Sequence, residues 1–84
     1  MSSPFDQRRS PALPVDHVAW TLRRGTHSVE ARLRQHPLGI ELWCIYDGAP
    51  LWSELFTRFQ PALDLDRALD DTRNAWEAKG WMRA

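Results

Sequence analysis

Few side chains in this sequence could carry out acid–base, nucleophilic or metal chemistry. His17, His27 and His36 stand far apart, and the chain has no Cys-x-x-Cys or His-x-x-x-His spacing that would hold a metal ion. Cys44 alternates with apolar residues, which is typical of a buried small side chain rather than a nucleophile. We therefore expect no catalytic residue, no metal site and no cofactor, and a protein that is not an enzyme. The acidic residues near the C-terminus are typical of the solvated side of a helix: Asp64, Asp66, Asp70, Asp71 and Glu77.

The remaining chemistry belongs to arginine and tryptophan, which bind anions, bases and apolar surfaces. The chain of 84 residues contains 5 Trp, and its 11 Lys and Arg balance 11 Asp and Glu. Residues 1–36 carry six Arg against three acidic side chains, 6 − 3 = +3, and residues 37–84 carry the opposite excess. Since a nucleic-acid binder normally has a clearly basic surface, the placement of the Arg and Trp side chains decides the function.

Length and composition bound the organisation of the chain. Eighty-four residues suffice for one small domain, which excludes a multi-step enzyme with its own cofactor domain. The sequence has no apolar stretch near the length of a membrane span and no apolar run at its start, so we expect no membrane contact and, with one cysteine, a cytoplasmic location. Residues 1–16 predict a flexible tail containing Pro and Arg, and residues 17–84 a single domain.

Alternation of apolar and polar residues predicts two strands on either side of Gly25 and Thr26. Glycine at the first central position suits a two-residue type II′ turn. If Arg24 pairs with His27, the apolar residues of both strands fall on one face. The expected cross-strand pairs are Leu22 with Val29, Trp20 with Ala31 and Val18 with Leu33.

A second hairpin is predicted around Asp47-Gly48, a strong signal for a type I′ turn. With Tyr46 opposite Ala49, the expected pairs are Cys44 with Leu51, Leu42 with Ser53 and Ile40 with Leu55. Between the hairpins, residues 36–39 supply a turn that brings Arg34 opposite Glu41 and Leu33 opposite Leu42. The four strands therefore form an antiparallel meander.

The C-terminal part of the chain predicts a helix from Leu65 to Lys79, with Asp64 as N-cap. One stripe of this helix faces inward: Leu65, Ala68, Leu69, Thr72, Ala75 and Trp76. Gly80 ends the helix, and Trp81 folds back onto its last turn. The predicted fold class is α+β, a four-stranded antiparallel meander with one C-terminal helix packed on one face (ββββα).

The predicted helix covers one face of the sheet and leaves the other face open. The residues expected to meet the helix are Val18, Trp20, Leu22, Val29, Ala31, Leu33, Ile40, Leu42, Cys44, Leu51 and Leu55. On the open face, Trp43 is expected opposite Trp52 and beside Arg32. The apolar side chains there exceed scattered surface apolarity, so a second copy, the tail, another protein or nucleic-acid bases should cover them. The expected binding residues are Arg23, Arg32, Arg34, Trp43, Ile45, Trp52 and Phe56.

A four-stranded meander followed by one helix, with Arg and aromatic residues on the open face, resembles the PUR and whirly group of single-stranded nucleic-acid-binding modules. The resemblance covers residues 17–82 and implies dimers or paired repeats that bind unpaired bases on the sheet. It places stacking platforms at Trp43, Trp52 and Phe56, and phosphate contacts at Arg23, Arg32 and Arg34. Two functions stay open: homodimerisation or protein interaction through the open face, and single-stranded DNA or RNA binding on the same face.

Overall fold

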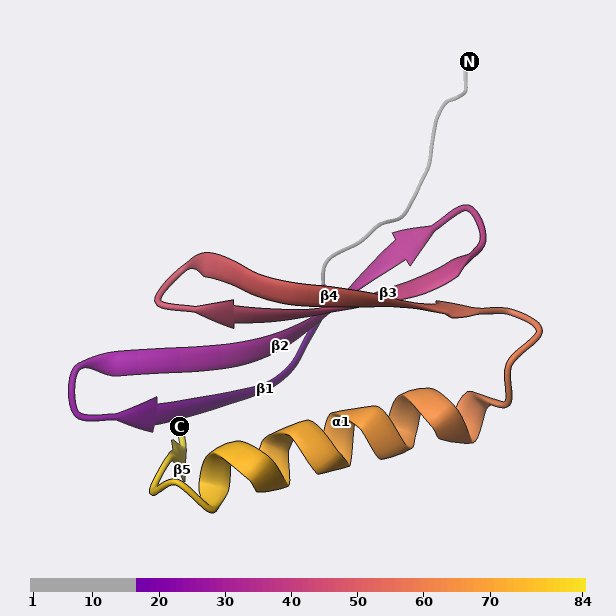
Figure 1. Cartoon of the computed structure of the whole chain (residues 1–84). Coiled ribbons are helices and arrows are strands. Elements are labelled where there is room, and N and C mark those ends of the chain that lie inside the picture. The colour runs from indigo at the N-terminus through magenta and orange to yellow at the C-terminus, as the bar shows by residue number, and fades with distance from the viewer. Residues whose placement is uncertain (1–16) are drawn as a thin grey trace.

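The computed structural model describes residues 17–84 and confirms the α+β fold class. Its elements are β1 (His17–Arg24), β2 (His27–His36), β3 (Gly39–Tyr46), β4 (Ala49–Thr57), α1 (Ala62–Glu77) and a short β5 (Met82–Arg83). The sheet has the order β4-β3-β2-β1-β5, and α1 lies along one face of it (Figure 1). The tail expected over residues 1–16 lies outside the described residues.

The first hairpin pairs as expected near its turn and departs from the expectation at its far end. Leu22 is opposite Val29 and Trp20 is opposite Ala31, but a bulge at Ala19 places Val18 opposite Arg32 instead of Leu33. An extra residue in one strand of a ladder reverses the face of every residue beyond it. Val18 is therefore 42% exposed, and Ala19 packs against the core in its place.

The pairing of β2 with β3 is confirmed throughout, with Leu33 opposite Leu42 and Arg34 opposite Glu41. The strand β3 begins at Gly39, a position that has no room for a side chain. A Cβ atom at this position would lie 2.0 Å from the backbone oxygen of Phe56 on β4. Gly39 thus lets the backbones of β3 and β4 approach each other at this end of the sheet.

The second hairpin has the expected turn but not the expected register. Asp47 and Gly48 both have positive φ, and Tyr46 is opposite Ala49. A bulge at Leu51 then shifts the ladder by one residue, so the expected pairs of the core face are wrong from this point on. The observed pairs are Cys44 with Trp52, Trp43 with Ser53, Leu42 with Glu54, Glu41 with Leu55 and Ile40 with Phe56. The bulge directly follows Pro50, a residue that is common at irregular positions of edge strands because it lacks an N–H group.

The outer edge of β4 carries features that oppose pairing with a further strand. Pro50 offers no N–H group, and the bulge at Leu51 interrupts the edge. At the other end of the strand, the N–H of Thr57 donates to Oε1 of Gln60 at 2.8 Å. This edge of the sheet is therefore poorly suited to strand addition.

The helix α1 begins earlier than expected, at Ala62 after Pro61, and Asp64 lies in its first turn instead of capping it. Proline is well tolerated where a helix starts because the first N–H groups have no partner within the helix. The other end follows the expectation: Gly80 has φ +95°, and the N–H of Trp81 donates to the carbonyl of Trp76 at 3.3 Å. Trp81 is buried between helix and sheet.

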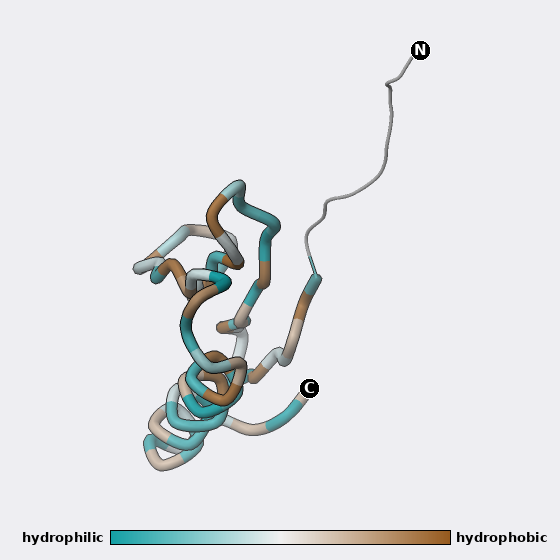
Figure 2. The backbone as a smooth tube through the Cα atoms, turned by 90° about the vertical axis from the view of Figure 1, so that its right-hand side faces the viewer, coloured by the Kyte–Doolittle hydropathy of each residue, from teal (hydrophilic) through white to brown (hydrophobic). Residues whose placement is uncertain are grey.

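Two groups of buried side chains form the core between the sheet and α1. The first contains Leu22, Val29, Cys44 and Trp81, and the second Ala31, Leu42 and Phe56. No residue of α1 itself is fully buried, and Leu65, Leu69 and Trp76 pack only partly against these groups. Figure 2 shows the layers from the side, with hydrophobic and hydrophilic residues interspersed along the strands. The helix therefore leaves much of β4 uncovered.

Candidate functional site

The candidate site is the sheet face turned away from α1, which we call the open face (Figure 1). The strand registers place five of the seven expected binding residues on it: Arg23, Arg32, Arg34, Trp43 and Ile45. The bulges add two apolar residues that the sequence pattern did not place there, Val18 from β1 and Leu55 from β4. The open face is therefore charged along β2 and mainly apolar along β3 and β4.

Phe56 does not belong to the open face, which corrects the expectation. It is opposite Ile40 on the helix side, is 8% exposed and packs with Ala31 and Leu42. The register shift at Leu51 is the physical reason, because it exchanges the two faces for the rest of β4. Phe56 is therefore a core residue, and its ring is not available to stack on nucleic-acid bases.

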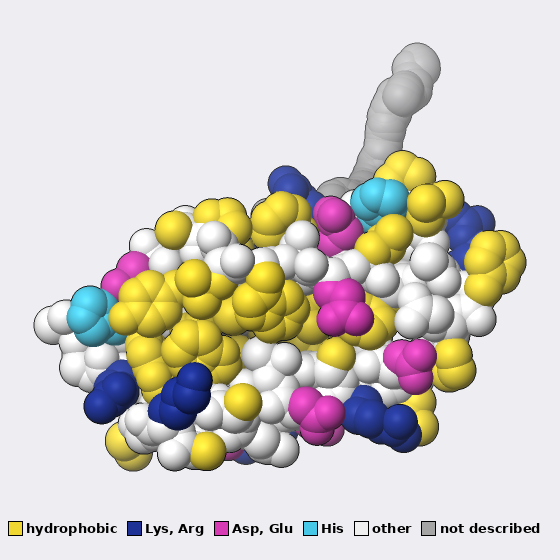
Figure 3. Space-filling view, in the orientation of Figure 1, with side chains coloured by type: hydrophobic (Ala, Val, Ile, Leu, Met, Phe, Trp, Pro, Cys, Tyr) yellow, Lys and Arg dark blue, Asp and Glu magenta, His cyan; other side chains and the backbone are white. Residues whose placement is uncertain are grey.

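Trp52 also lies on the helix side, opposite Cys44, so the expected pair of Trp43 with Trp52 is wrong. Its side chain is 39% exposed, whereas Phe56, further along the same strand, is covered by α1. Figure 3 shows hydrophobic side chains gathered between the strands and the helix on this side of the molecule. The apolar surface of β4 is thus divided between the two faces instead of being concentrated on one.

A signal for this division was present in the sequence. From Leu51 to Phe56 the residues run as two apolar, two polar and two apolar, which fits neither face of an alternating strand. Such a run directly after a proline is compatible with a bulge. Val18 and Ala19 carried a weaker signal, because three apolar residues in succession allow either register.

The charged groups of the open face bind one another. Nε of Arg32 donates to Oε2 of Glu30 at 2.7 Å, and Nε1 of Trp43 donates to Oε1 of Glu41 at 3.4 Å. The Arg34 guanidinium lies 5.9 Å from the centre of the Trp43 ring, within the range of a cation–π contact. An incoming phosphate would therefore compete with Glu30 for Arg32 and with the Trp43 ring for Arg34.

His27, His36 and Asp47 have structural partners in the turns. Nδ1 of His27 donates to Oδ2 of Asp47 at 2.6 Å, and the Ser28 N–H donates to Oδ1 at 2.8 Å, which ties the tips of the two hairpins together. Nδ1 of His36 accepts from the Leu38 N–H within its own turn. Burial raises the pKa of the Cys44 thiol, which opposes formation of a nucleophilic thiolate.

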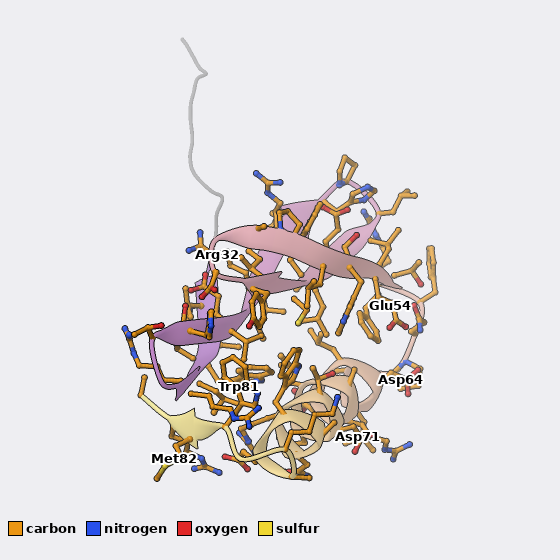
Figure 4. The ribbon with its side chains drawn as sticks, turned by 60° about the vertical axis from the view of Figure 1, so that its left-hand side comes forward. Arg32, Glu54, Asp64, Asp71, Trp81 and Met82 are labelled. Carbon is orange, nitrogen blue, oxygen red and sulfur yellow. The ribbon has the colours of Figure 1, made fainter. Side chains whose placement is uncertain are left out.

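The acidic residues of α1 do not converge on a site. Asp70 pairs with Arg73 at 3.2 Å, and Glu77 pairs with Arg83 at 3.0 Å. Figure 4 shows Asp64 and Asp71 at the outside of the helix, whereas Trp81 lies between helix and sheet. Within residues 17–84, no group of three or more His, Cys, Asp or Glu side chains could hold a metal ion.

A pocket of about 560 Å³ opens where the β2–β3 turn meets the start of α1. Its walls are mainly apolar and include Ile40, Phe56 and Leu65. The polar groups at its rim already bind backbone atoms, since Arg58 donates to the carbonyl of Pro37 and Gln60 accepts from Thr57. The pocket therefore lacks the convergent polar groups of a small-molecule site.

Comparisons with protein-family models, with curated proteins and with solved structures give no match for this chain. In the part of the chain that the structure describes, no helix is long and apolar enough to cross a membrane.

Proposed function

We propose that this protein is a small non-enzymatic binding module that forms homodimers through its open face. The observation that carries the proposal is a sheet face that no other element of residues 17–84 covers, on which Trp43, Ile45 and Leu55 lie together beside the Arg32–Glu30 ion pair. An antiparallel sheet with one solvated face normally alternates between apolar and polar residues, and β3 does not. A partner that covers this face would bury its apolar residues.

The composition of the open face favours a protein partner. Interfaces have an apolar centre with a polar rim, and Trp and Arg are enriched among the residues that contribute most to affinity. Here the apolar centre lies on β3 and β4, and Glu30, Arg32 and Arg34 follow β2 beside it. The outer edge of β4 opposes strand addition, which favours contact through the face.

Light scattering coupled to size exclusion tests homodimerisation on the full chain. We expect a dimer at micromolar concentration, and a monomer for Trp43→Glu and for Leu55→Glu. Leu63→Glu is the matched control, because Leu63 is an exposed residue of α1 on the other side of the sheet. Circular dichroism and melting temperature establish that each variant is folded. A monomeric wild-type chain at high concentration contradicts the proposal.

Single-stranded nucleic-acid binding is the second candidate, favoured by the cation–π contact of Arg34 with Trp43 and by Arg23 on the same face. A mixed-sequence oligonucleotide at about 50 mM salt should then quench tryptophan fluorescence, because bases stack on exposed rings. The double variant Arg32→Ala plus Arg34→Ala should lose the signal. No change in fluorescence or anisotropy with the wild-type chain removes this candidate.

A further inference from the structure

The charges of the open face are arranged so that the face is complementary to itself. Along β2 the outward residues are Glu30, Arg32 and Arg34. Directly opposite them on β3 stand Ile45, Trp43 and Glu41, in the same order. Each arginine of β2 thus has on the neighbouring strand the kind of group that binds it, a ring for Arg32 and a carboxylate for Arg34.

We propose, resting on the proposed function, that two copies stack their open faces about a two-fold axis that runs parallel to the strands, between β2 and β3. This rotation keeps the position along the strands and exchanges β2 with β3. Arg34 then faces Glu41 of the partner subunit, and Arg32 faces Trp43 of the partner subunit. The two-fold axis repeats each contact, so the dimer contains both pairs twice.

Other axes parallel to the strands give a poorer match. An axis over β2 brings Arg32 and Arg34 against their own copies. An axis over β3 stacks the two Trp43 rings but also brings Glu41 against Glu41 of the partner subunit. Facing like charges oppose association, so these arrangements are disfavoured.

An axis across the strands is no better. Placed at Trp43, it brings Arg32 against its own copy. Among these alternatives, only the axis between β2 and β3 sets every arginine of β2 against an aromatic or acidic group.

The arrangement also accounts for the exposure of Val18. The axis places β1 over β4 of the partner subunit, so Val18, which the bulge at Ala19 exposes, is covered. Packed sheets lie about 10 Å apart, a distance that opposing Arg and Glu side chains can span. The rows of β2 and β3 then lie equally close to the axis at the centre of the interface, and β1 and β4 lie toward its edges.

Charge reversal tests this geometry on the full chain. Arg34→Glu and Glu41→Arg each bring like charges together at both copies of the contact. We expect each variant to raise the dimer dissociation constant by at least about 100-fold, tenfold for each contact. Arg67→Glu, on α1 away from the open face, makes the same change of charge as Arg34→Glu and should leave the constant unchanged.

Mixing the two variants provides the decisive measurement. A chain with Arg34→Glu and a chain with Glu41→Arg regain opposite charges at both contacts, so an equimolar mixture should form heterodimers by light scattering. The double variant, with both changes in one chain, should likewise dimerise. Because Arg34 and Glu41 are also cross-strand neighbours within one chain, melting curves are measured for each single variant. In the mixture each chain still has like charges at these two neighbouring positions, so restored dimerisation cannot come from a repair within one chain.

The outcomes separate the two proposals. A wild-type chain that stays monomeric overturns the proposed homodimer. A wild-type dimer that tolerates either single reversal, or a mixture that stays monomeric, overturns this two-fold arrangement and leaves homodimerisation standing.

Discussion

At the scale of single residues, side chains of one chemical type have opposite roles according to the face on which they lie. Trp43 is on the open face, whereas Trp81 is buried among Leu22, Val29 and Cys44. Phe56 is a core residue, and Phe59 is 90% exposed in the loop before α1. The identity of an aromatic residue therefore says little about its role until the strand register is known.

The contrast between the two phenylalanines gives the first prediction. Phe56→Ala removes a buried ring and should lower the free energy of unfolding by about 3–5 kcal/mol, the usual cost for such a truncation. Phe59→Ala is the matched control and should change it by less than about 0.5 kcal/mol. Chemical denaturation of both variants measures the difference. Equal losses of unfolding free energy in the two variants would indicate that Phe56 is exposed on the open face.

The second prediction concerns pH and the hairpin tie at Asp47. Hydrogen bonds from His27 and from the Ser28 N–H lower the pKa of the Asp47 carboxyl below its ordinary value of 3.8. A lowered pKa in the folded state stabilises the protein above the unfolded value, and this contribution is lost as the pH falls through the folded pKa. The melting temperature of Asp47→Asn should therefore lie below that of the wild type near neutral pH. The difference should shrink as the pH falls below about 4, and a constant difference from pH 7 to pH 2 would contradict this account.

At the scale of elements, the predicted strands and the register of β2 with β3 are confirmed because the turn residues and the alternation agree. Glycine and Asp-Gly fix the hairpin turns, and each face of the central strands has a consistent polarity. The sequence does not determine the register beyond Ala19 and Leu51. There the neighbouring residues suit both faces, and packing against α1 decides between them.

The ends of the elements also depend on tertiary structure. Pro61 and Asp64 both suit the start of a helix, and only the folded chain distinguishes them. The strand β5 has two residues and no pattern of its own. It pairs with β1 because the buried Trp81 brings Met82 and Arg83 beside Leu22 and Arg23. The β2 and β3 parts of the candidate site could therefore be predicted, and the β4 part could not.

The third prediction concerns the approach of β3 to β4. Gly39→Ala places a methyl group against the backbone of Phe56, where no side chain can move away. We expect a loss of at least about 2 kcal/mol in the free energy of unfolding, as for an overpacked core. Gly25→Ala is the control for backbone conformation, because φ is +62° there and no atom lies within 4 Å of the added Cβ. A smaller loss for Gly39→Ala than for Gly25→Ala would contradict the steric explanation.

At the scale of the whole molecule, the net charge of zero and the exposed apolar surface favour association with protein over association with polyanions. The open face has no excess charge large enough to attract a phosphate backbone from a distance. Its apolar residues are instead suited to a contact that excludes water. The response to salt therefore distinguishes the two candidate functions.

The fourth prediction follows from this difference. Between about 50 and 500 mM salt, the dimer dissociation constant should change by less than about tenfold, because burial of apolar area is little screened. If Arg23, Arg32 and Arg34 instead bind phosphates, affinity for a single strand should fall by about 100-fold over the same range, from a slope of about 0.7 per contact. Light scattering and fluorescence titrations at both salt concentrations measure the two responses.

The outer edge of β4, which opposes strand addition, limits how far the proposed assembly can grow. A face-to-face dimer uses the open face of both copies, and Pro50, the bulge at Leu51 and the Gln60 contact to Thr57 deny the sheet another strand at that edge. Linear growth through the open face or through the β4 edge needs that surface to be available after each addition, and neither of these two surfaces would be available in the proposed dimer. An exposed edge strand rich in Leu, Trp and Phe is an aggregation hazard. In the proposed dimer this segment would belong to a particle of defined size, and Pro50 and the bulge at Leu51 oppose cross-β pairing along it.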